Sequence, residues 1–179
     1  MVPLRFDRAR IQGLLELAGE RLTGEWLLIG GAAAAAWFAP VRTTEDIDLV
    51  GLGGSSGERF ALMELAASAA IPVEAVNSAA DFFVRRVDGW RAQIVPLHRG
   101  TSATIYRPTA TLFILLKLNR LSAVDLEDCL ALVEHCEKSG EAIDRVRVLA
   151  WIDALPPTRD ASLGERRARL RAALATAPR

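Results

Sequence analysis

The sequence predicts an α/β protein of the α+β class, with a small mixed β-sheet flanked by helices and a helical C-terminal half. Three observations predict this class. Short apolar runs such as Trp26–Ile29 end at glycine or proline, which is typical of buried strands. Apolar residues at helical spacing lie between these runs, and from Ala110 onward only helical patterns follow. Of the 179 residues, 51% are hydrophobic, which is enough for a sizeable core.

Residues 1–106 are expected to form the α/β core. Asp7 is expected to cap a first helix whose apolar stripe includes Ile11 and Leu14. The pair Asp88-Gly89 is a strong two-residue hairpin signal. The expected elements after the first helix are a strand at Trp26–Ile29, a helix at Gly30–Phe38, a strand at Asp46–Val50, a helix at Glu58–Ala70, a short strand at Pro72–Val76, and a hairpin of Phe82–Val87 with Trp90–Leu97.

Residues 107–179 are expected to form a helical region that packs on the core. Arg107-Pro108-Thr109 precedes a long apolar run, and Pro156-Pro157 breaks the pattern further on. The expected helices are Ala110–Leu121, Asp125–Lys138, Glu141–Leu155 and a last one that starts at the capping-box pattern Ser162-Leu163-Gly164-Glu165.

The cysteines and the lack of targeting signals predict a cytoplasmic protein that does not enter a membrane. Cys129 and Cys136 share a helix face about 10 Å apart along its axis, too far for a disulfide, so we expect buried free thiols in a reducing compartment. The N-terminus does not resemble a signal peptide, and the apolar run Trp26–Phe38 is far shorter than the ~20 residues of a membrane helix. A formal net charge of zero gives no overall basic field for nucleic acid.

Asp46 and Asp48 are the strongest candidates for a functional site. They lie two residues apart in an apolar, strand-like run, so their side chains are expected to project from the same face. Two such carboxylates repel each other unless a positive charge lies between them. The pair can end a strand or bind an arginine such as Arg42, but the apolar flanks favour a divalent cation. Mg²⁺ or Mn²⁺ takes oxygen ligands from one or two carboxylates and from substrate phosphates.

Gly30 and Gly31 give a second signal upstream of the aspartates. They follow the apolar run Leu27-Leu28-Ile29 and precede an alanine-rich helix. Paired glycines at this position let a phosphate-bearing ligand approach the backbone at the start of the helix. The sequence therefore predicts a phosphate-binding turn close to the pair of carboxylates.

The pattern G-G followed by R-x-T-x-D-x-D, at residues 30–48, resembles the nucleotidyltransferase superfamily with the polymerase-beta-like fold. The closer likeness is to the small bacterial AbiEii-like group, which includes toxin-type transferases. The resemblance extends from about Leu27 to Leu132, with little information between Gly51 and Phe82. It implies that the glycines and aspartates bind a metal-chelated nucleoside triphosphate. Arg42 and Thr44 either contact phosphate or complete a turn.

The same resemblance implies a third carboxylate, and this chain departs from it. The segment Asp88–Leu97 aligns with the hairpin that carries this carboxylate in the superfamily, and the position falls on Gln93. A glutamine offers one neutral oxygen to a metal and cannot act as a general base. Either catalysis is weak or altered, or another nearby acid substitutes: Asp88, Asp81 or Glu74.

Lys117 lies in an almost entirely apolar stretch, where a lysine is costly unless it is paired or reaches solvent. The superfamily has a lysine on the corresponding helix, then an arginine and a D-x-x-D element, matched here by Arg120 and by Asp125 with Asp128. The resemblance implies that Lys117 contacts the triphosphate. The alternatives are a lysine that reaches solvent or pairs structurally with Asp125 or Asp128, and for the two aspartates we expect a structural role at a helix start.

Two functions are expected from these residues. The first is a metal-dependent transferase that moves a nucleoside monophosphate from an NTP to an RNA such as tRNA, a protein or a small molecule. The family likeness suggests a toxin–antitoxin or phage-defence role, with an antitoxin as partner. The second is a catalytically impaired module that binds a nucleotide or a partner protein, which Gln93 favours.

Overall fold

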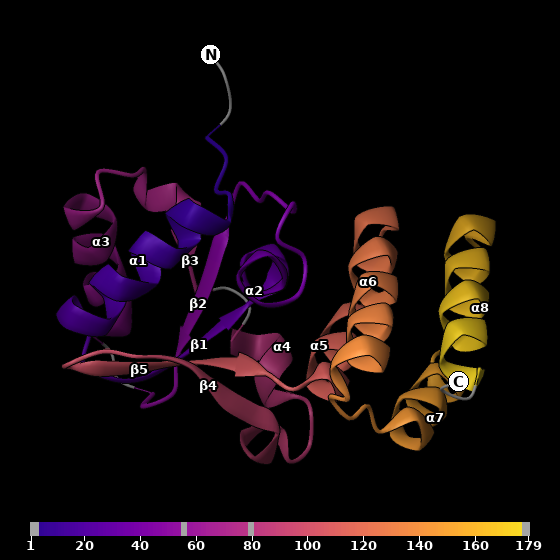
Figure 1. The fold of residues 1–179 in the computed structure, drawn as a ribbon. Coiled ribbons are helices and arrows are strands. Elements are labelled where there is room, and N and C mark those ends of the chain that lie inside the picture. The colour runs from indigo at the N-terminus through magenta and orange to yellow at the C-terminus, as the bar shows by residue number, and fades with distance from the viewer. Residues whose placement is uncertain (1–3, 55–56, 79–80, 177–179) are drawn as a thin grey trace. The chain divides into compact units, whose positions relative to one another are not determined.

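The strand β1 (Gly24–Ile29) lies at the centre of a five-stranded mixed sheet of order β3-β2-β1-β5-β4 in the computed structural model (Figure 1). It pairs antiparallel with β2 (Ile47–Gly51) and parallel with β5 (Ala103–Pro108). The edge strands are β3 (Val76–Asn77) and β4 (Ile94–Arg99). All four residues from Trp26 to Ile29 are buried, so both faces of β1 are covered.

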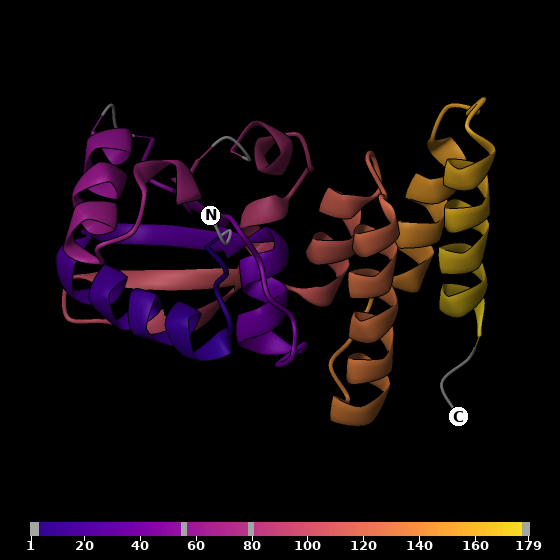
Figure 2. The ribbon, with the colours of Figure 1, turned by 90° about the horizontal axis from the view of Figure 1, so that it is seen from above.

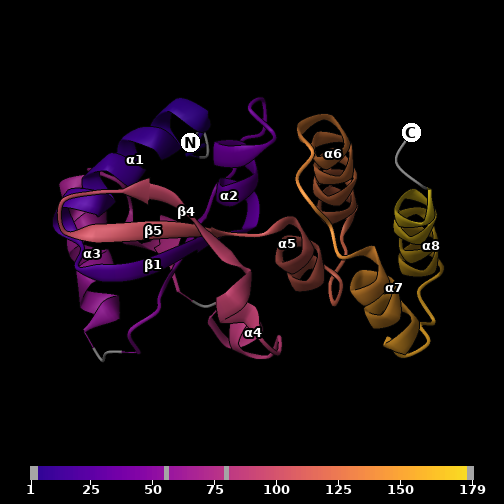
Figure 3. The same cartoon turned by 60° about the horizontal axis from the view of Figure 1, so that its bottom comes forward.

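The structure describes residues 4–54, 57–78 and 81–176, which divide into two compact units at Pro108/Thr109. The first unit contains the sheet and four helices: α1 (Arg8–Arg21), α2 (Gly30–Trp37), α3 (Glu58–Ser68) and the short α4 (Asp81–Arg85). Figures 2 and 3 show α1 and α2 on the same side of the sheet. A mixed sheet combined with helices confirms the predicted α+β class.

The first third of the chain follows its sequence pattern closely. Asp7 caps α1 as predicted, because its carboxylate accepts a hydrogen bond from the Arg10 N–H at 2.9 Å. The strands β1 and β2 and the helix α2 lie within two residues of their expected bounds. The alanines 32–35 of α2 are fully buried, and their small side chains let the helix pack closely in the core.

The hairpin predicted around Asp88-Gly89 is wrong. Residues 81–85 form α4 instead, and Trp90–Gln93 form a 3₁₀ turn. Val84 is buried while Phe82 and Phe83 are exposed, and the Arg85 guanidinium pairs with Asp81 one helical turn away at 2.7 Å. Gly89 has a φ of 70°, so it serves a turn into the 3₁₀ segment rather than a hairpin loop.

The hairpin of this region is formed by β4 and β5 around Gly100, and it is fixed to α1 by backbone contact. The Ser102 N–H donates to the Gly19 carbonyl at 2.9 Å. A side chain at Gly100 would overlap the backbone of Gly19, so the two glycines allow the helix and the hairpin loop to approach this closely. This close approach cannot be predicted from β-hairpin signals, which describe only the two residues of a tight turn.

The second unit consists of four helices, α5 (Ala110–Lys117), α6 (Ala123–Ser139), α7 (Arg145–Ala154) and α8 (Ala161–Ala175). Three expected boundaries are wrong. The first helix ends at Lys117 rather than Leu121, α7 begins after its cap Asp144 rather than at Glu141, and α8 begins after Asp160 rather than at Ser162. In the last two cases the aspartate carboxylate accepts hydrogen bonds from the first free N–H groups of the helix, so the helix begins directly after that aspartate. Within the described residues, every helix is too short or too polar to cross a membrane.

Replacing Gly100 with alanine is expected to destabilise the first unit by about 1–3 kcal/mol, because the new methyl group forces backbone to move. Gly13→Ala is the matched control. Gly13 lies inside α1 with nothing within 4 Å of a new Cβ, so alanine should stabilise by about 0.5–1 kcal/mol. Urea unfolding of both variants measures the difference. Equal effects of the two substitutions would contradict the proposed contact between α1 and the hairpin.

Candidate functional site

The turn between β1 and α2 brings the glycine pair against the second aspartate. Gly30 begins α2 with a φ of 68°, a conformation that side-chain-bearing residues rarely adopt. A Cβ on Gly30 would lie 2.6 Å from Oδ2 of Asp48. The register explains the contact, since Ile29 at the end of β1 is directly opposite Asp48 on β2. Glycine is therefore required here both by the backbone angle and by the position of the carboxylate.

Gly31 likewise lies close to side chains of the residues that precede β2. A Cβ on Gly31 would lie 2.9 Å from Oγ1 of Thr44 and 3.4 Å from Nη2 of Arg42. The two motifs, separated in sequence, thus meet in space: Gly30 faces Asp48, and Gly31 faces Thr44 and Arg42. This is the part of the predicted site that the structure brings together.

Thr44 holds the segment that leads into β2. Its backbone exchanges two hydrogen bonds with Phe6, of 2.8 and 3.1 Å. Its hydroxyl donates to the Asp46 carbonyl at 3.1 Å. Arg42 donates from Nη1 to the neighbouring Thr43 carbonyl. Both Arg42 and Thr44 therefore have a part in shaping the turn, which was one of the two predicted roles.

Asp46 and Asp48 differ in exposure. Asp46 directly precedes β2 and is exposed, whereas Asp48 lies within the strand and is half-buried. The strand begins at Ile47, one residue later than expected. Asp48 is thus held within the sheet, and Asp46 lies directly before the strand.

Gln93 lies at the same end of the sheet but is not brought to the aspartates by the strands. It is the last residue of the 3₁₀ turn, directly before Ile94 on the edge strand β4. The strands β5 and β1 lie between β4 and β2, and three inter-strand spacings of about 4.8 Å place their backbones roughly 14 Å apart. Its side-chain nitrogen is buried without a hydrogen-bond partner. Its role in catalysis stays a prediction.

Asn77 is a neighbour of the aspartates that the sequence analysis missed. It lies on β3 directly opposite Asp48. The strand expected at Pro72–Val76 is wrong over most of its length, because Val73–Ala75 form a 3₁₀ turn and β3 contains only Val76 and Asn77. The signal available in the sequence was a polar residue at the end of a short apolar strand. That signal does not reveal which strand lies beside it, because register between parallel strands depends on tertiary packing.

The residues present fit a hard divalent cation that is only partly held by protein. Within the described ranges, no three His, Cys, Asp or Glu side chains gather as a preformed metal site would require. Two carboxylates suffice for Mg²⁺ or Mn²⁺ when phosphate oxygens and water complete the shell. The side chains of Asp48, Thr44 and Arg42 lie beside the two glycines, so a phosphate at the start of α2 would meet these groups. The donor set is thus suited to a metal that enters together with its phosphate ligand.

Lys117, in the second unit, has two acidic partners there. Its Nζ donates to Asp125 at 2.7 Å and to Asp128 at 3.1 Å, and all three side chains are at most a tenth exposed. Arg120 donates to both carboxylate oxygens of Asp125, at 2.8 Å to Oδ2 and 2.9 Å to Oδ1, and Ser122 forms a capping box with Asp125 at the start of α6. Structural pairing, one of the predicted alternatives for Lys117, is therefore present. Its contact with a triphosphate stays a prediction.

The surroundings of Lys117 also shift two pKa values. Burial would raise the pKa of Asp125, but hydrogen bonds from Arg120, Lys117 and Ser122 outweigh it and hold that pKa well below its usual range. Burial raises the pKa of the Cys129 thiol to about 12. Cys129 and Cys136 are both buried and free, as predicted. A thiol with so high a pKa remains protonated at neutral pH.

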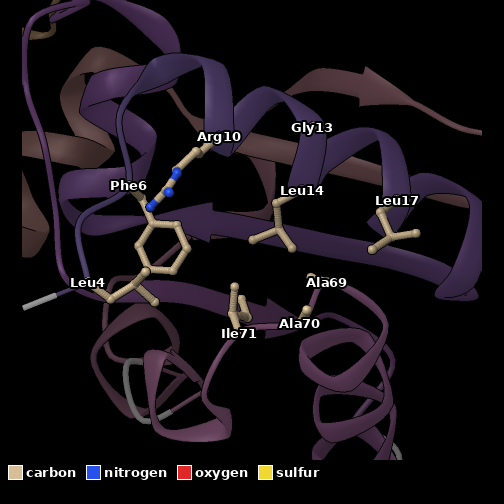
Figure 4. Close-up of a pocket in the computed structure, with 9 residues that line it drawn as sticks. All are labelled: Leu4, Phe6, Arg10, Gly13, Leu14, Leu17, Ala69, Ala70 and Ile71. Atoms are coloured by element: carbon tan, nitrogen blue, oxygen red, sulfur yellow. The ribbon is translucent and has the colours of Figure 1, made fainter.

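A cavity of about 350 Å³ lies elsewhere in the first unit, between α1 and the segment that follows α3 (Figure 4). Its wall is apolar except for Arg10, and it is lined by Leu4, Phe6, Leu14, Leu17 and the stretch Ala69–Ile71 among others. None of the predicted site residues lines this cavity. This cavity is therefore not part of the candidate site.

Comparisons with known proteins leave the site to be judged by its own geometry. No family model, curated protein or solved structure matches the chain. The nucleotidyltransferase likeness of the sequence motifs accordingly stays a prediction, and its strength depends on the glycines, the aspartates and their contacts.

Lys117→Met is expected to destabilise the second unit by about 3–5 kcal/mol, because it leaves two buried carboxylates without their shared cation. Arg120→Met is the matched control: that side chain also pairs with Asp125 but is 77% exposed, so its loss should cost less than about 1 kcal/mol. The comparison is made by urea unfolding at pH 7. A cost for Lys117→Met as small as that of the control would mean that the buried pairs contribute little.

Asp125→Asn should reduce stability at pH 7 and reduce it less at pH 3. The folded pKa of Asp125 is depressed, so its contribution is present above the unfolded value of about 3.9 and is lost as the pH falls below it. Urea midpoints of both proteins between pH 3 and 7 test this. Asp153→Asn, which removes an exposed pair with Arg171, should show little pH dependence. A gap between wild type and Asp125→Asn that is constant with pH would contradict the assignment.

Proposed function

We propose that this protein is a metal-dependent nucleotidyltransferase that moves a nucleoside monophosphate from an NTP to an acceptor. The observation that carries the proposal is the contact of Gly30 with Asp48, because it joins a phosphate-binding turn to a metal-binding carboxylate. Bound between the aspartates and the triphosphate, Mg²⁺ or Mn²⁺ would neutralise charge on the phosphates. The acceptor is an RNA such as tRNA, a protein or a small molecule.

Each residue has a distinct part in this proposal. Gly30 and Gly31 let the phosphates approach the start of α2, where Ile29 provides no side-chain cap for the first N–H groups. Asp46 and Asp48 hold the cation. Arg42, whose guanidinium lies beside Gly31, offers a fork-shaped donor to a phosphate.

Lys117 and Thr44 complete the set of proposed contacts. The family likeness assigns Lys117 to the triphosphate, and in the second unit its ammonium group is held by Asp125 and Asp128. Thr44 supports the aspartates through its bond to the Asp46 carbonyl. Such transfer depends mainly on positioning and charge neutralisation, which these groups provide without a covalent intermediate. A toxin–antitoxin or phage-defence setting, with an antitoxin as partner, belongs to the same proposal.

A second candidate function is a module that binds a nucleotide or a partner without transfer. It is favoured by Gln93, which offers no carboxylate. Gln93 directly precedes β4, and two strands separate β4 from β2. A protein with two carboxylates can chelate a triphosphate through one cation and still lack the group that activates the acceptor. The two candidates share the binding site and differ only in turnover.

Transfer activity separates the two candidates. We expect wild-type protein with Mg²⁺ or Mn²⁺ and α-³²P-labelled NTPs to label an acceptor in a cell extract, and Asp46→Asn/Asp48→Asn to label it at least ~100-fold less, since ligand loss exceeds the usual effect of a neighbouring residue. Glu64→Gln, an exposed carboxylate on α3, is the control and should keep full activity.

Thermal unfolding with each NTP and metal accompanies the assay. A ligand at 100 times its Kd adds about 2.7 kcal/mol to stability, which is easily seen. A metal-dependent NTP shift without any labelling would support the binding module and contradict transfer. If neither labelling nor an NTP shift occurred, transfer and nucleotide binding would both fail, and only binding of a partner protein would remain.

A further inference from the structure

Asn77 lies closer in the sheet to Asp48 than any other residue of β3. The strands β2 and β3 are parallel, with Ile47 opposite Val76 and Asp48 opposite Asn77. Ile47 and Val76 are both buried, at 1% and 6% exposure. Side chains alternate between the two faces of a strand, so Asp48 and Asn77 project together from the other face.

The chemistry of this pair suits a shared cation. Neighbouring strands lie about 4.8 Å apart, and paired side chains on one face are within contact range. Asn77 is half-buried, like Asp48. An asparagine amide has a carbonyl oxygen, which is a ligand for hard cations, and an NH₂ group that can donate to a carboxylate. Asn77 lies on the β3 side of Asp48, and the turn at Gly30 lies on its β1 side.

We propose that Asn77 is the third protein oxygen ligand of the cation held by Asp46 and Asp48, in place of a third carboxylate. This inference rests on the proposed function. It follows that the protein offers two negative charges and one neutral oxygen, so a divalent cation balances the formal charge of the two aspartates before any phosphate is bound. Free metal is then held weakly, and the cation enters chiefly as its complex with the triphosphate.

Substituting Asn77 with aspartate tests the assignment, because it supplies the carboxylate that the site lacks. The probe is Mn²⁺ alone, measured by the loss of the free-ion signal in electron paramagnetic resonance. Asn77→Asp should tighten Mn²⁺ binding at least ~10-fold, and Asn77→Leu should weaken it by a similar factor, the scale of groups that support a metal site. Asn119→Asp, the same change at an exposed position in the second unit, should leave the affinity unchanged.

Stability without metal gives a second measurement. Asn77→Asp places two like charges opposite each other on neighbouring strands, so its Tm should fall in the absence of metal and recover when Mn²⁺ is added. Asn119→Asp should show neither change. Asn77→Ser, a smaller polar substitution, is measured in case Asn77→Leu does not fold, and it should also bind Mn²⁺ more weakly than wild type.

The outcomes distinguish this inference from the proposed function. If Mn²⁺ binds, is lost in Asp48→Asn, and responds to Asn77→Asp but not to Asn119→Asp, the assignment holds. If binding depends on Asp48 but is the same in Asn77→Asp and Asn119→Asp, Asn77 is no ligand and the proposed function stands. If no variant binds Mn²⁺ in the presence or absence of NTP, the cation site and the proposed function both fail.

Discussion

The end of strand β1 at Ile29 is the constraint on which the rest of the first unit depends. Because β1 is paired on both sides, the strand register places Asp48 of β2 and Pro108 of β5 at the same end of the sheet as Ile29. The chain must turn into α2 at that point, and Asp48 fills the space where a side chain would go. Only a glycine in the left-handed conformation satisfies both demands. One backbone turn thus places a helix start, two glycines and a carboxylate together.

The two units stabilise paired carboxylates in different ways. In the second unit, Asp125 and Asp128 are buried and share the ammonium group of Lys117, which gives a closed and rigid pairing within the protein. In the first unit, Asp46 is exposed and Asp48 is half-buried beside glycine backbone. Carboxylates with this access to solvent can exchange their counter-charge, which is what binding and release of a metal–nucleotide complex require. The buried pair is thus closed by a cation of the protein itself, whereas Asp46 and Asp48 lie nearer to solvent.

The sequence predicts the parts of the structure that depend on local rules. Asp7 as a cap, the strand before Gly30, the alanine helix and the two buried thiols all follow from spacing and residue type. The parts that fail depend on contacts between distant segments. Asp88-Gly89 has the chemistry of a hairpin, yet the hairpin forms around Gly100, where Gly19 of α1 leaves room for the loop. For the site, the sequence predicts that the glycines lie close to the aspartates. The distance of Gln93 from the aspartates and the position of Asn77 opposite Asp48 depend on strand order, which local sequence patterns do not contain.

Locating a bound cation tests the proposed site most directly. Addition of Mn²⁺ with a non-hydrolysable NTP to ¹⁵N-labelled protein broadens the amide signals of residues near the metal. The account predicts that the signals of Gly30, Gly31 and Asp48 are lost first, and that they remain in Asp46→Asn/Asp48→Asn under the same conditions. Broadening centred on other acidic residues, such as Asp81 or Glu134, with the signals of Gly30 and Gly31 unchanged, would contradict a cation and phosphate site at the end of β1.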